Sequence, residues 1–291
     1  MDSESLKIFC AVAAELSITN AAARLGRVPS NVTTRIQQLE AEMGAALFLR
    51  SGKRIALSGA GERFLDYAKR MLALEEEARH VVTGGRDGGA LRIGSMESTA
   101  ASRLPAVLAS YHARHPATRL ELRTGASRQL LEQVRTGKLD CAFAALPPAM
   151  DGHADLADMG LQARAIWTEE LLLLLPAGTE NVADARAVQP RSLAAFPQGC
   201  TYRGAAEAWL GIAGGGEWQI QEMSSYHAMI ACVAAGASVS VLPASVLQLS
   251  PAAAVLRSIG LGTMDTCLVW RQGFDVPAFQ NLAGQLWPAG A

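Results

Sequence analysis

The sequence predicts an α+β protein in which a small helical unit is joined by one long helix to a larger, two-lobed α/β region. Three observations lead to this fold class. Apolar residues recur at helical spacing through residues 3–43, residues 62–82 contain neither Gly nor Pro, and strand and helix patterns alternate from residue 91 onward. A chain of 291 residues is long enough for two or three domains.

The composition fits a globular protein with one locally basic region. Hydrophobic residues make up 50% of the chain and charged residues 18%, enough for a large core. The net charge of −1 excludes a chain that coats nucleic acid along its whole length. Five scattered cysteines without a CxxC pair indicate free thiols in a reducing compartment. Because no signal segment begins the chain, we expect a cytoplasmic protein.

Residues 223–256 contain no Asp, Glu, Lys or Arg and therefore need comparison with a membrane span. Gly236, Ser238 and Pro243 interrupt the stretch, and alanine rather than leucine dominates it. A buried helix, a glycine turn and a short strand explain this pattern better. We expect no membrane contact.

Residues 1–58 predict three short helices and a hairpin, the pattern of a winged helix-turn-helix. Thr19 is the expected N-cap of a second helix that ends at Gly26, and Ser30 the expected N-cap of a third that ends at Gly44. The third helix repeats apolar residues on one face. These residues are Val32, Ile36, Leu39 and Met43.

The third helix has the features of a DNA recognition helix. Ala22 and Ala23 are small enough to let the second helix cross it closely, and short polar residues occupy its N-terminal end. Residues 24–54 contain six basic and two acidic side chains, a local excess of positive charge. Basic residues of the hairpin turn would contact phosphates or the minor groove. The predicted DNA contacts are Thr19, Arg27, Ser30, Asn31, Thr33, Thr34, Arg35, Arg50, Lys53 and Arg54.

Residues 59–83 predict a long helix that pairs with a second copy of itself. Two apolar series, each with a spacing of seven, are offset by three residues, as along the seam of a coiled coil. A glycine-rich hinge at 84–89 then separates this helix from the rest of the chain. The residues predicted to dimerise are Phe64, Tyr67, Met71, Leu74, Ala78 and Val81.

Residues 90–291 predict two α/β lobes with a cleft between them. Alternating strands and helices imply right-handed crossovers and a mainly parallel sheet, and short apolar runs at 171–175 and 267–271 are expected strands. Ligands of such sheets bind outside the carboxyl ends of strands. Lobe I is assigned to about 90–163 and 267–291, and lobe II to about 164–266.

The N-terminal quarter resembles the DNA-binding domain of LysR-type transcriptional regulators. The similar motifs are S-I-T-N-A-A from Ser17, P-S-N-V-T-T-R-I-Q-Q-L-E from Pro29 and M-G-A-A-L-F-L-R from Met43. Leu57–Gly61 resembles the start of the family's linker helix, and Ala234–Pro243 resembles a motif of its C-terminal domain.

This resemblance implies a winged helix-turn-helix, a dimerising linker helix and a periplasmic-binding-like effector domain. It also implies a homotetramer that bends its operator. The segment Asn31–Thr34 departs from the Ser-Ala-Val-Ser of many members, which leaves the base preference unassigned. Gly94–Ala101 and Glu222–His227 look like a smaller branch that includes regulators of putrescine use.

The cleft is expected to hold a small molecule. Ser98 and Thr99 lie where a strand meets its helix, so their hydroxyls hold a carboxylate, cap the helix, or do both. Arg203 would pair with a carboxylate, whereas Glu97 and Glu222 would favour an amine. An amine, an amino acid and a carboxylate all stay open. The predicted effector contacts are Ser98, Thr99, Thr124, Ala145, Cys200, Tyr202, Arg203, Glu222, Ser225 and Tyr226.

Two other classes of protein compete with a regulator: an enzyme or solute receptor of the two-lobed fold, and a helical interaction module. An enzyme would need a nucleophile and a base, for which only Cys200 and the distant His227 are available. Cys200 is otherwise a redox sensor or a small buried residue. His112 and His115 lack a third ligand, so neither a metal nor a cofactor is expected. The expected partners are duplex DNA, an effector and further copies of the chain, with RNA polymerase as a further candidate.

Overall fold

The computed structural model describes residues 1–51, 54–82, 89–146, 154–179, 182, 184–212 and 218–287. The chain forms two compact units, Met1–Thr83 and a second unit that begins at Gly84, and each is described by itself. Within the described ranges, no helix is both long enough and apolar enough to cross a membrane.

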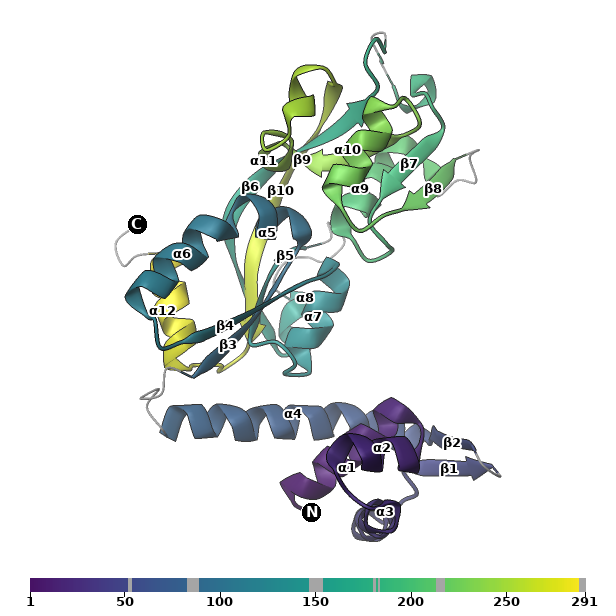
Figure 1. Cartoon of the computed structure of the whole chain (residues 1–291), viewed down its shortest axis with the longest axis vertical. Coiled ribbons are helices and arrows are strands. Elements are labelled where there is room, and N and C mark those ends of the chain that lie inside the picture. The colour runs from purple at the N-terminus through teal and green to yellow at the C-terminus, as the bar shows by residue number, and fades with distance from the viewer. Residues whose placement is uncertain are drawn as a thin grey trace. The chain divides into compact units, whose positions relative to one another are not determined.

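In the N-terminal unit, helices pack around one core and a two-stranded hairpin extends from it (Figure 1). Phe9 lies in this core, with its ring centroid 5.3 Å from that of Phe48 and 5.0 Å from that of Phe64. The core thus joins the first helix to the hairpin and to the long helix. The elements are α1 (Ser3–Glu15), α2 (Ile18–Leu25), α3 (Pro29–Met43), β1 (Phe48–Ser51), β2 (Arg54–Leu57) and α4 (Gly59–Val82).

The short helices lie where the sequence predicts them, but the two predicted N-caps are wrong. Ser17 caps α2, because its Oγ accepts a hydrogen bond from the Asn20 N–H at 3.3 Å, and Thr19 lies inside the helix. The N-cap of α3 is Val28, and Ser30 lies in the first turn. Pro29 favours this earlier start. The backbone N–H at the first position of a helix has no partner within the helix, and proline has no N–H to leave unpaired.

Burial corrects two further expectations for the helix pair. Ala21 and Ala22 are buried while Ala23 is exposed, so the small residues at the core are shifted by one position. Met43 is exposed, and the buried face of α3 therefore ends at Leu39.

The long helix α4 presents only part of the predicted seam. Phe64 and Met71 are half-buried and pack against the core of their own unit. Tyr67, Leu74 and Ala78 are exposed. Of the predicted seam, these three side chains are therefore accessible for contact with a second copy of the chain. The side chain of Val81 lies outside the described residues.

The hairpin is fastened to both neighbouring helices. Glu40 Oε1, on α3, accepts hydrogen bonds from the N–H groups of Leu47 at 2.8 Å and Phe48 at 3.0 Å. Ser58 Oγ accepts a hydrogen bond from the N–H of Gly61, in the first turn of α4, at 2.9 Å. A Cβ atom on Gly61 would lie 2.0 Å from the carbonyl oxygen of Leu47. The close approach of α4 to the hairpin therefore leaves no room for a side chain at position 61.

The C-terminal unit is built on one eight-stranded mixed sheet in the order β4-β3-β5-β10-β6-β9-β7-β8. Its centre is a pair of 15-residue antiparallel strands, β6 (Leu161–Leu175) and β10 (Arg257–Arg271). The outer strands of each lobe are parallel: β3 pairs with β4 and β5, and β7 pairs with β8 and β9. The expectation of a mainly parallel sheet is therefore wrong at the centre, and the short strands predicted at 171–175 and 267–271 are the ends of β6 and β10.

Helices cover both faces of this sheet (Figure 1). Along β5, Cys141 and Phe143 join the cluster beneath α6 and α12, whereas Ala142 and Ala145 join the cluster that contains α7. This one strand thus contributes side chains to two hydrophobic cores. The other elements are β3 (Ala90–Ser95), α5 (Glu97–Ser102), α6 (Leu104–Arg114), β4 (Arg119–Thr124), α7 (Ser127–Arg135), β5 (Cys141–Ala145), α8 (Ala154–Asp158), β7 (Ser192–Ala195), α9 (Thr201–Leu210), β8 (Gln219–Glu222), α10 (Tyr226–Ala234), β9 (Val239–Pro243), α11 (Ala244–Leu247) and α12 (Pro277–Leu286).

We expect Gly61→Ala to destabilise the N-terminal unit by about 1–3 kcal/mol, because the added methyl group would meet backbone that cannot move aside easily. Gly59→Ala is the matched control, since its Cβ would have Arg63 Nη1 at 3.8 Å as its nearest neighbour. Differential scanning calorimetry of the full chain measures both variants. Equal melting temperatures would contradict the prediction.

Candidate functional sites

The N-terminal half of α3 presents a polar surface. Ser30, Asn31 and Thr34 are exposed, and Thr33 and Arg35 are half-buried. The hydroxyls of Thr33 and Thr34 donate to the carbonyls of Pro29 and Ser30, each at 3.0 Å. Their hydrogens are used within the helix, so each threonine offers a partner a lone pair and a methyl group. These groups fit the amino groups of adenine or cytosine and the methyl group of thymine.

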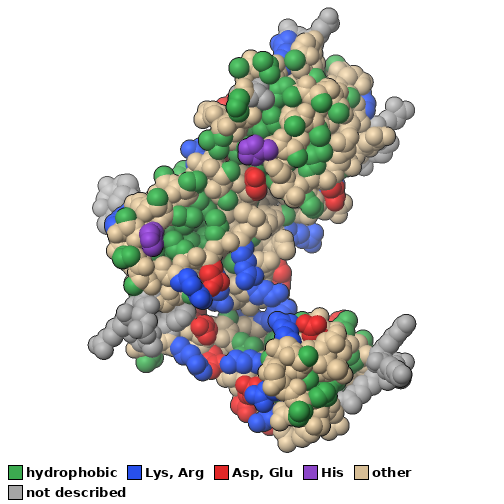
Figure 2. Space-filling model, in the orientation of Figure 1, with side chains coloured by type: hydrophobic (Ala, Val, Ile, Leu, Met, Phe, Trp, Pro, Cys, Tyr) green, Lys and Arg blue, Asp and Glu red, His purple; other side chains and the backbone are tan. Residues whose placement is uncertain are grey.

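The arginines around α3 pair with acidic residues of α1 and with its N-cap, Asp2. Positions 1–83 contain 11 basic and 10 acidic residues, so the charge excess of the whole unit is smaller than that of residues 24–54 alone. Figure 2 shows Lys or Arg and Asp or Glu side chains next to one another on this unit. Such exposed pairs contribute little free energy, and a phosphate can replace the carboxylate. The pairs are Arg24–Glu15 at 3.2 Å, Arg27–Glu4 at 2.7 Å and Arg35–Asp2 at 3.5 Å.

The predicted contacts of the hairpin are described only in part. Arg50 lies in β1 and Arg54 in β2, but their side chains lie outside the described residues, as does Lys53. Thr19 is exposed on α2.

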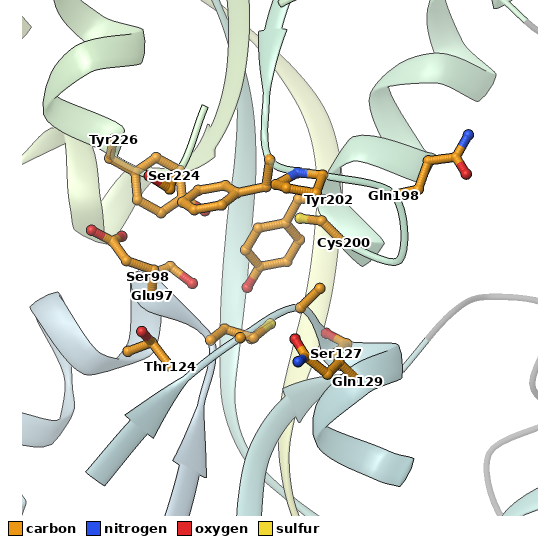
Figure 3. A pocket seen from close by; sticks show the side chains of 15 residues that line it. Glu97, Ser98, Thr124, Ser127, Gln129, Gln198, Cys200, Tyr202, Ser224 and Tyr226 are labelled. Carbon is orange, nitrogen blue, oxygen red and sulfur yellow. The ribbon is translucent and has the colours of Figure 1, made fainter. Parts of the chain in front are cut away.

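A cavity of about 420 Å³ lies between the two lobes of the C-terminal unit. Figure 3 shows side chains that enter it from both sides: Glu97, Ser98 and Thr124 from the first lobe, and Tyr202 and Tyr226 from the second. The first set comes from the start of α5 and the end of β4, and the second from the starts of α9 and α10. The site is thus assembled at the ends of strands, as open α/β sheets predict.

Five of the ten predicted effector residues line this cavity and five do not. Those that line it are Ser98, Thr124, Cys200, Tyr202 and Tyr226. Those outside its lining are Thr99, Ala145, Arg203, Glu222 and Ser225.

Three of the predicted residues outside the lining are buried, hydrogen-bonded within the protein or placed at a helix start. Thr99 is buried, and the Ala145 carbonyl accepts a hydrogen bond from Thr201 Oγ1 at 2.8 Å. Ser225 is the N-cap of α10. Their predicted role at the effector therefore has no support from the cavity.

Arg203 is held by partners within the protein. Its guanidinium pairs with Glu207 and Glu222, each at 2.7 Å, and also donates to the Phe196 carbonyl at 3.1 Å. The residue is 6% exposed. Because two carboxylates already pair with this guanidinium, a third carboxylate from a ligand would be disfavoured by like-charge repulsion.

Several polar atoms around the cavity are buried without a hydrogen-bond partner. Among the described residues these include Oε2 of Glu97, Oγ of Ser98 and the hydroxyl of Tyr202. Burial raises the pKa of Glu97, an effect that His227 partly opposes, and burial raises the pKa of Tyr202 to about 12. The Ser98 hydroxyl lies near enough to the two phenols, Tyr202 and Tyr226, to affect their pKa values, yet its geometry gives no hydrogen bond. Such unmet polar groups are the groups that a polar ligand would satisfy.

Cys200 is half-buried in the wall of the cavity. Burial raises the pKa of its thiol above the ordinary value, against the opposing effect of backbone N–H groups of α9. The thiolate, which is the reactive form, is therefore disfavoured at neutral pH. This environment argues against the redox-sensor alternative.

Ten of the 15 residues that line the cavity are absent from the predicted effector contacts. Residues 196–198 follow β7, a strand that the pattern did not reveal. Residues 125–127 follow β4, and the rule about the carboxyl ends of strands would have found them. The additional lining residues are Met96, Glu97, Gly125, Ala126, Ser127, Gln129, Phe196, Pro197, Gln198 and Ser224.

Comparison with solved structures identifies full-length regulators of the same fold. CbnR in complex with its target DNA has a TM-score of 0.64 at 22% identity, and the match covers 98% of this chain and 99% of that one. A full-length OxyR variant from Pseudomonas aeruginosa has a TM-score of 0.68 at 22% identity and covers 98% and 94%.

Sequence comparison gives the family. "Bacterial regulatory helix-turn-helix protein, lysR family" matches residues 3–62, and "LysR substrate binding domain" matches residues 84–290. The Bacillus subtilis regulator YusT is 37% identical over 258 residues, which is 88% of this chain and 84% of that protein. GltR of the same organism is 34% identical over 248 residues, covering 85% and 81%. The chain therefore belongs to the LysR family of DNA-binding transcriptional regulators, with an N-terminal helix-turn-helix domain and a C-terminal effector-binding domain.

Proposed function

We propose that this regulator reads its operator through the N-terminal half of α3, acting on DNA in the cytoplasm. The exposed polar surface of Ser30, Asn31 and Thr34 carries the proposal. Arg27 and the basic hairpin residues would then bind phosphates and set the position of α3 in the major groove. Residues 1–58 act as the DNA-binding part, and residues 90–291 act as the effector domain. The predicted hinge at 84–89 between them lies, except for Gly89, outside the described residues.

The signal for the regulator is a small organic molecule bound in the cavity between the lobes. The unmet Ser98 and Tyr202 hydroxyls support this proposal, because a ligand that satisfies them gains hydrogen bonds that the empty site lacks. Such a ligand binds groups from both lobes and therefore biases their relative arrangement.

The regulator acts as an oligomer of identical chains, a dimer through α4 and a tetramer in full. The exposed Tyr67, Leu74 and Ala78 support the α4 contact, since they form an apolar strip on one side of the helix. RNA polymerase is a further candidate partner, because a regulator bound at an operator lies beside promoter DNA.

Asn31→Ala should weaken binding to the DNA upstream of the chain's own gene by about 5- to 100-fold while leaving binding to random DNA unchanged. Arg27→Ala should weaken both equally and reduce the slope of log affinity against log salt by about 1. Fluorescence anisotropy at several salt concentrations measures these effects. Arg114→Ala, which removes an exposed cation from α6, is the control. Absence of wild-type binding at low salt would refute operator binding at this DNA.

Leu74→Asp should shift the chain toward smaller species in sedimentation velocity, because a charge in an apolar seam opposes pairing. Leu74 is 63% exposed within one chain, so the variant should still fold. Glu76→Gln, on the opposite side of α4, is the control. An unchanged distribution of species would exclude Leu74 from the dimer contact.

Tyr202→Phe should leave the free energy of unfolding unchanged or raise it by about 1 kcal/mol, since it removes a buried hydroxyl without a partner. Tyr111→Phe is the matched control, because the Tyr111 hydroxyl donates to the Ala278 carbonyl at 2.9 Å and its loss should cost about 1 kcal/mol. Urea denaturation of the ligand-free protein compares the two. A larger loss for Tyr202→Phe would mean that its hydroxyl is already satisfied.

A further inference from the structure

The lining of the cavity is negatively charged at one point and has no compensating cation. Among its described lining residues, Glu97 is the one carboxylate, and neither Lys, Arg nor His is present. Oε2 of Glu97 is buried without a hydrogen-bond partner. A carboxylate oxygen that is buried without a partner loses hydration without replacement, so an incoming cation would stabilise it.

Two arginines beside the cavity, Arg203 and Arg103, are paired with acids of the protein. Arg203 donates hydrogen bonds to two carboxylates and one carbonyl of the protein. Arg103, which follows α5, pairs with the buried Glu169 at 2.7 Å. Exposed His227, on α10, is close enough to Glu97 to affect its pKa but forms no ion pair with it in the described part of the chain. Arg103 and Arg203 are therefore each matched by an acid, and neither pairs with Glu97. The exposed Arg128 lies between the lining residues Ser127 and Gln129 but is not itself part of the described lining.

A ligand carboxylate would meet unfavourable surroundings here. The first turn of α5, where an anion would otherwise benefit from free N–H groups, already carries Glu97. A second negative charge beside this carboxylate would repel it in a partly buried site. The hydroxyls of Ser98 and Tyr202, both at most 2% exposed, can accept as well as donate and so suit an N–H donor equally well.

Aromatic rings complete the site for a cation. The rings of Phe196 and Tyr226 meet edge to face with centroids 4.9 Å apart, and both residues line the cavity. Tyr202 adds a third ring, and Met96 and Pro197 add apolar wall. Aromatic faces attract ammonium groups, and the apolar wall fits a short hydrocarbon body.

We infer that the effector is a small organic cation whose protonated nitrogen pairs with Glu97 and lies against the aromatic rings of the cavity, and that carboxylates lacking such a nitrogen are rejected. This inference rests on the proposed role of the cavity as the effector site. It narrows the three ligand classes left open by the sequence to those that carry an ammonium group.

The test uses three probes of nearly equal shape: benzylammonium, benzyl alcohol and benzoate. Isothermal titration calorimetry and thermal shift on the full chain should show benzylammonium binding at millimolar concentration, with benzyl alcohol weaker and benzoate weakest. Glu97→Gln, which keeps the shape and removes the charge, should lower the affinity for benzylammonium by about 10- to 100-fold. Glu170→Gln removes an exposed carboxylate from β6 and should change nothing.

The possible results distinguish a wrong ligand class from a wrong ligand site. The inference is overturned if benzoate binds more tightly than benzylammonium, if Glu97→Gln binds benzylammonium as well as wild type does, or if benzylammonium does not bind. Ser224→Trp narrows the cavity at an exposed lining position. If the probes bind this variant as tightly as wild type, the cavity itself is not the ligand site, and the proposed function of the cavity fails instead.

Discussion

The antiparallel pair of β6 and β10 is the constraint on which the C-terminal unit depends. Their register runs from Leu161 opposite Arg271 to Leu175 opposite Arg257, with shifts between Gly260 and Gly262 and between Thr266 and Cys267. The first lobe is attached through β5 at one end of this ladder, and the second through β9 at the other. Any change in the angle between the lobes must therefore bend or twist these two strands, and the register shifts are the places where a ladder bends most easily.

Contacts beside this ladder set the distance between the lobes. Thr201 Oγ1 donates across to the Ala145 carbonyl, and the Arg128 N–H donates to the Gly199 carbonyl at 3.3 Å. Buried Thr266, on β10, has a hydroxyl without a partner near Tyr202. Unmet hydroxyls from a lobe and from the ladder thus lie together. A ligand that forms hydrogen bonds with the hydroxyls of the lobe therefore also changes the surroundings of Thr266 on β10.

The sequence predicted elements well where one periodicity held for the whole element. The apolar face of α3 and the glycines that end α2 and α3 were found this way, and Gly26 and Gly44 both have φ of +64°. The first ten residues of β6 were missed because they are half-exposed and include polar residues such as Thr168 and Glu170. Half of the predicted effector contacts line the cavity, because strand ends are visible in a sequence, whereas the partners of Arg203 lie four, seven and 19 residues away.

Burial decides which arginines of this regulator are available to a ligand. Arg27 and its partner Glu4 have side chains 36% and 37% exposed, so solvent screens the pair and DNA phosphate can take the place of the carboxylate. The Arg203 side chain is 7% exposed, and separating it from its partners would leave a buried charge unpaired. The same type of ion pair is thus exchangeable in the N-terminal unit and fixed beside the cavity. Because the fixed pairs occupy Arg103 and Arg203, the carboxylate of Glu97 is the charged group that the described lining of the cavity presents to a ligand.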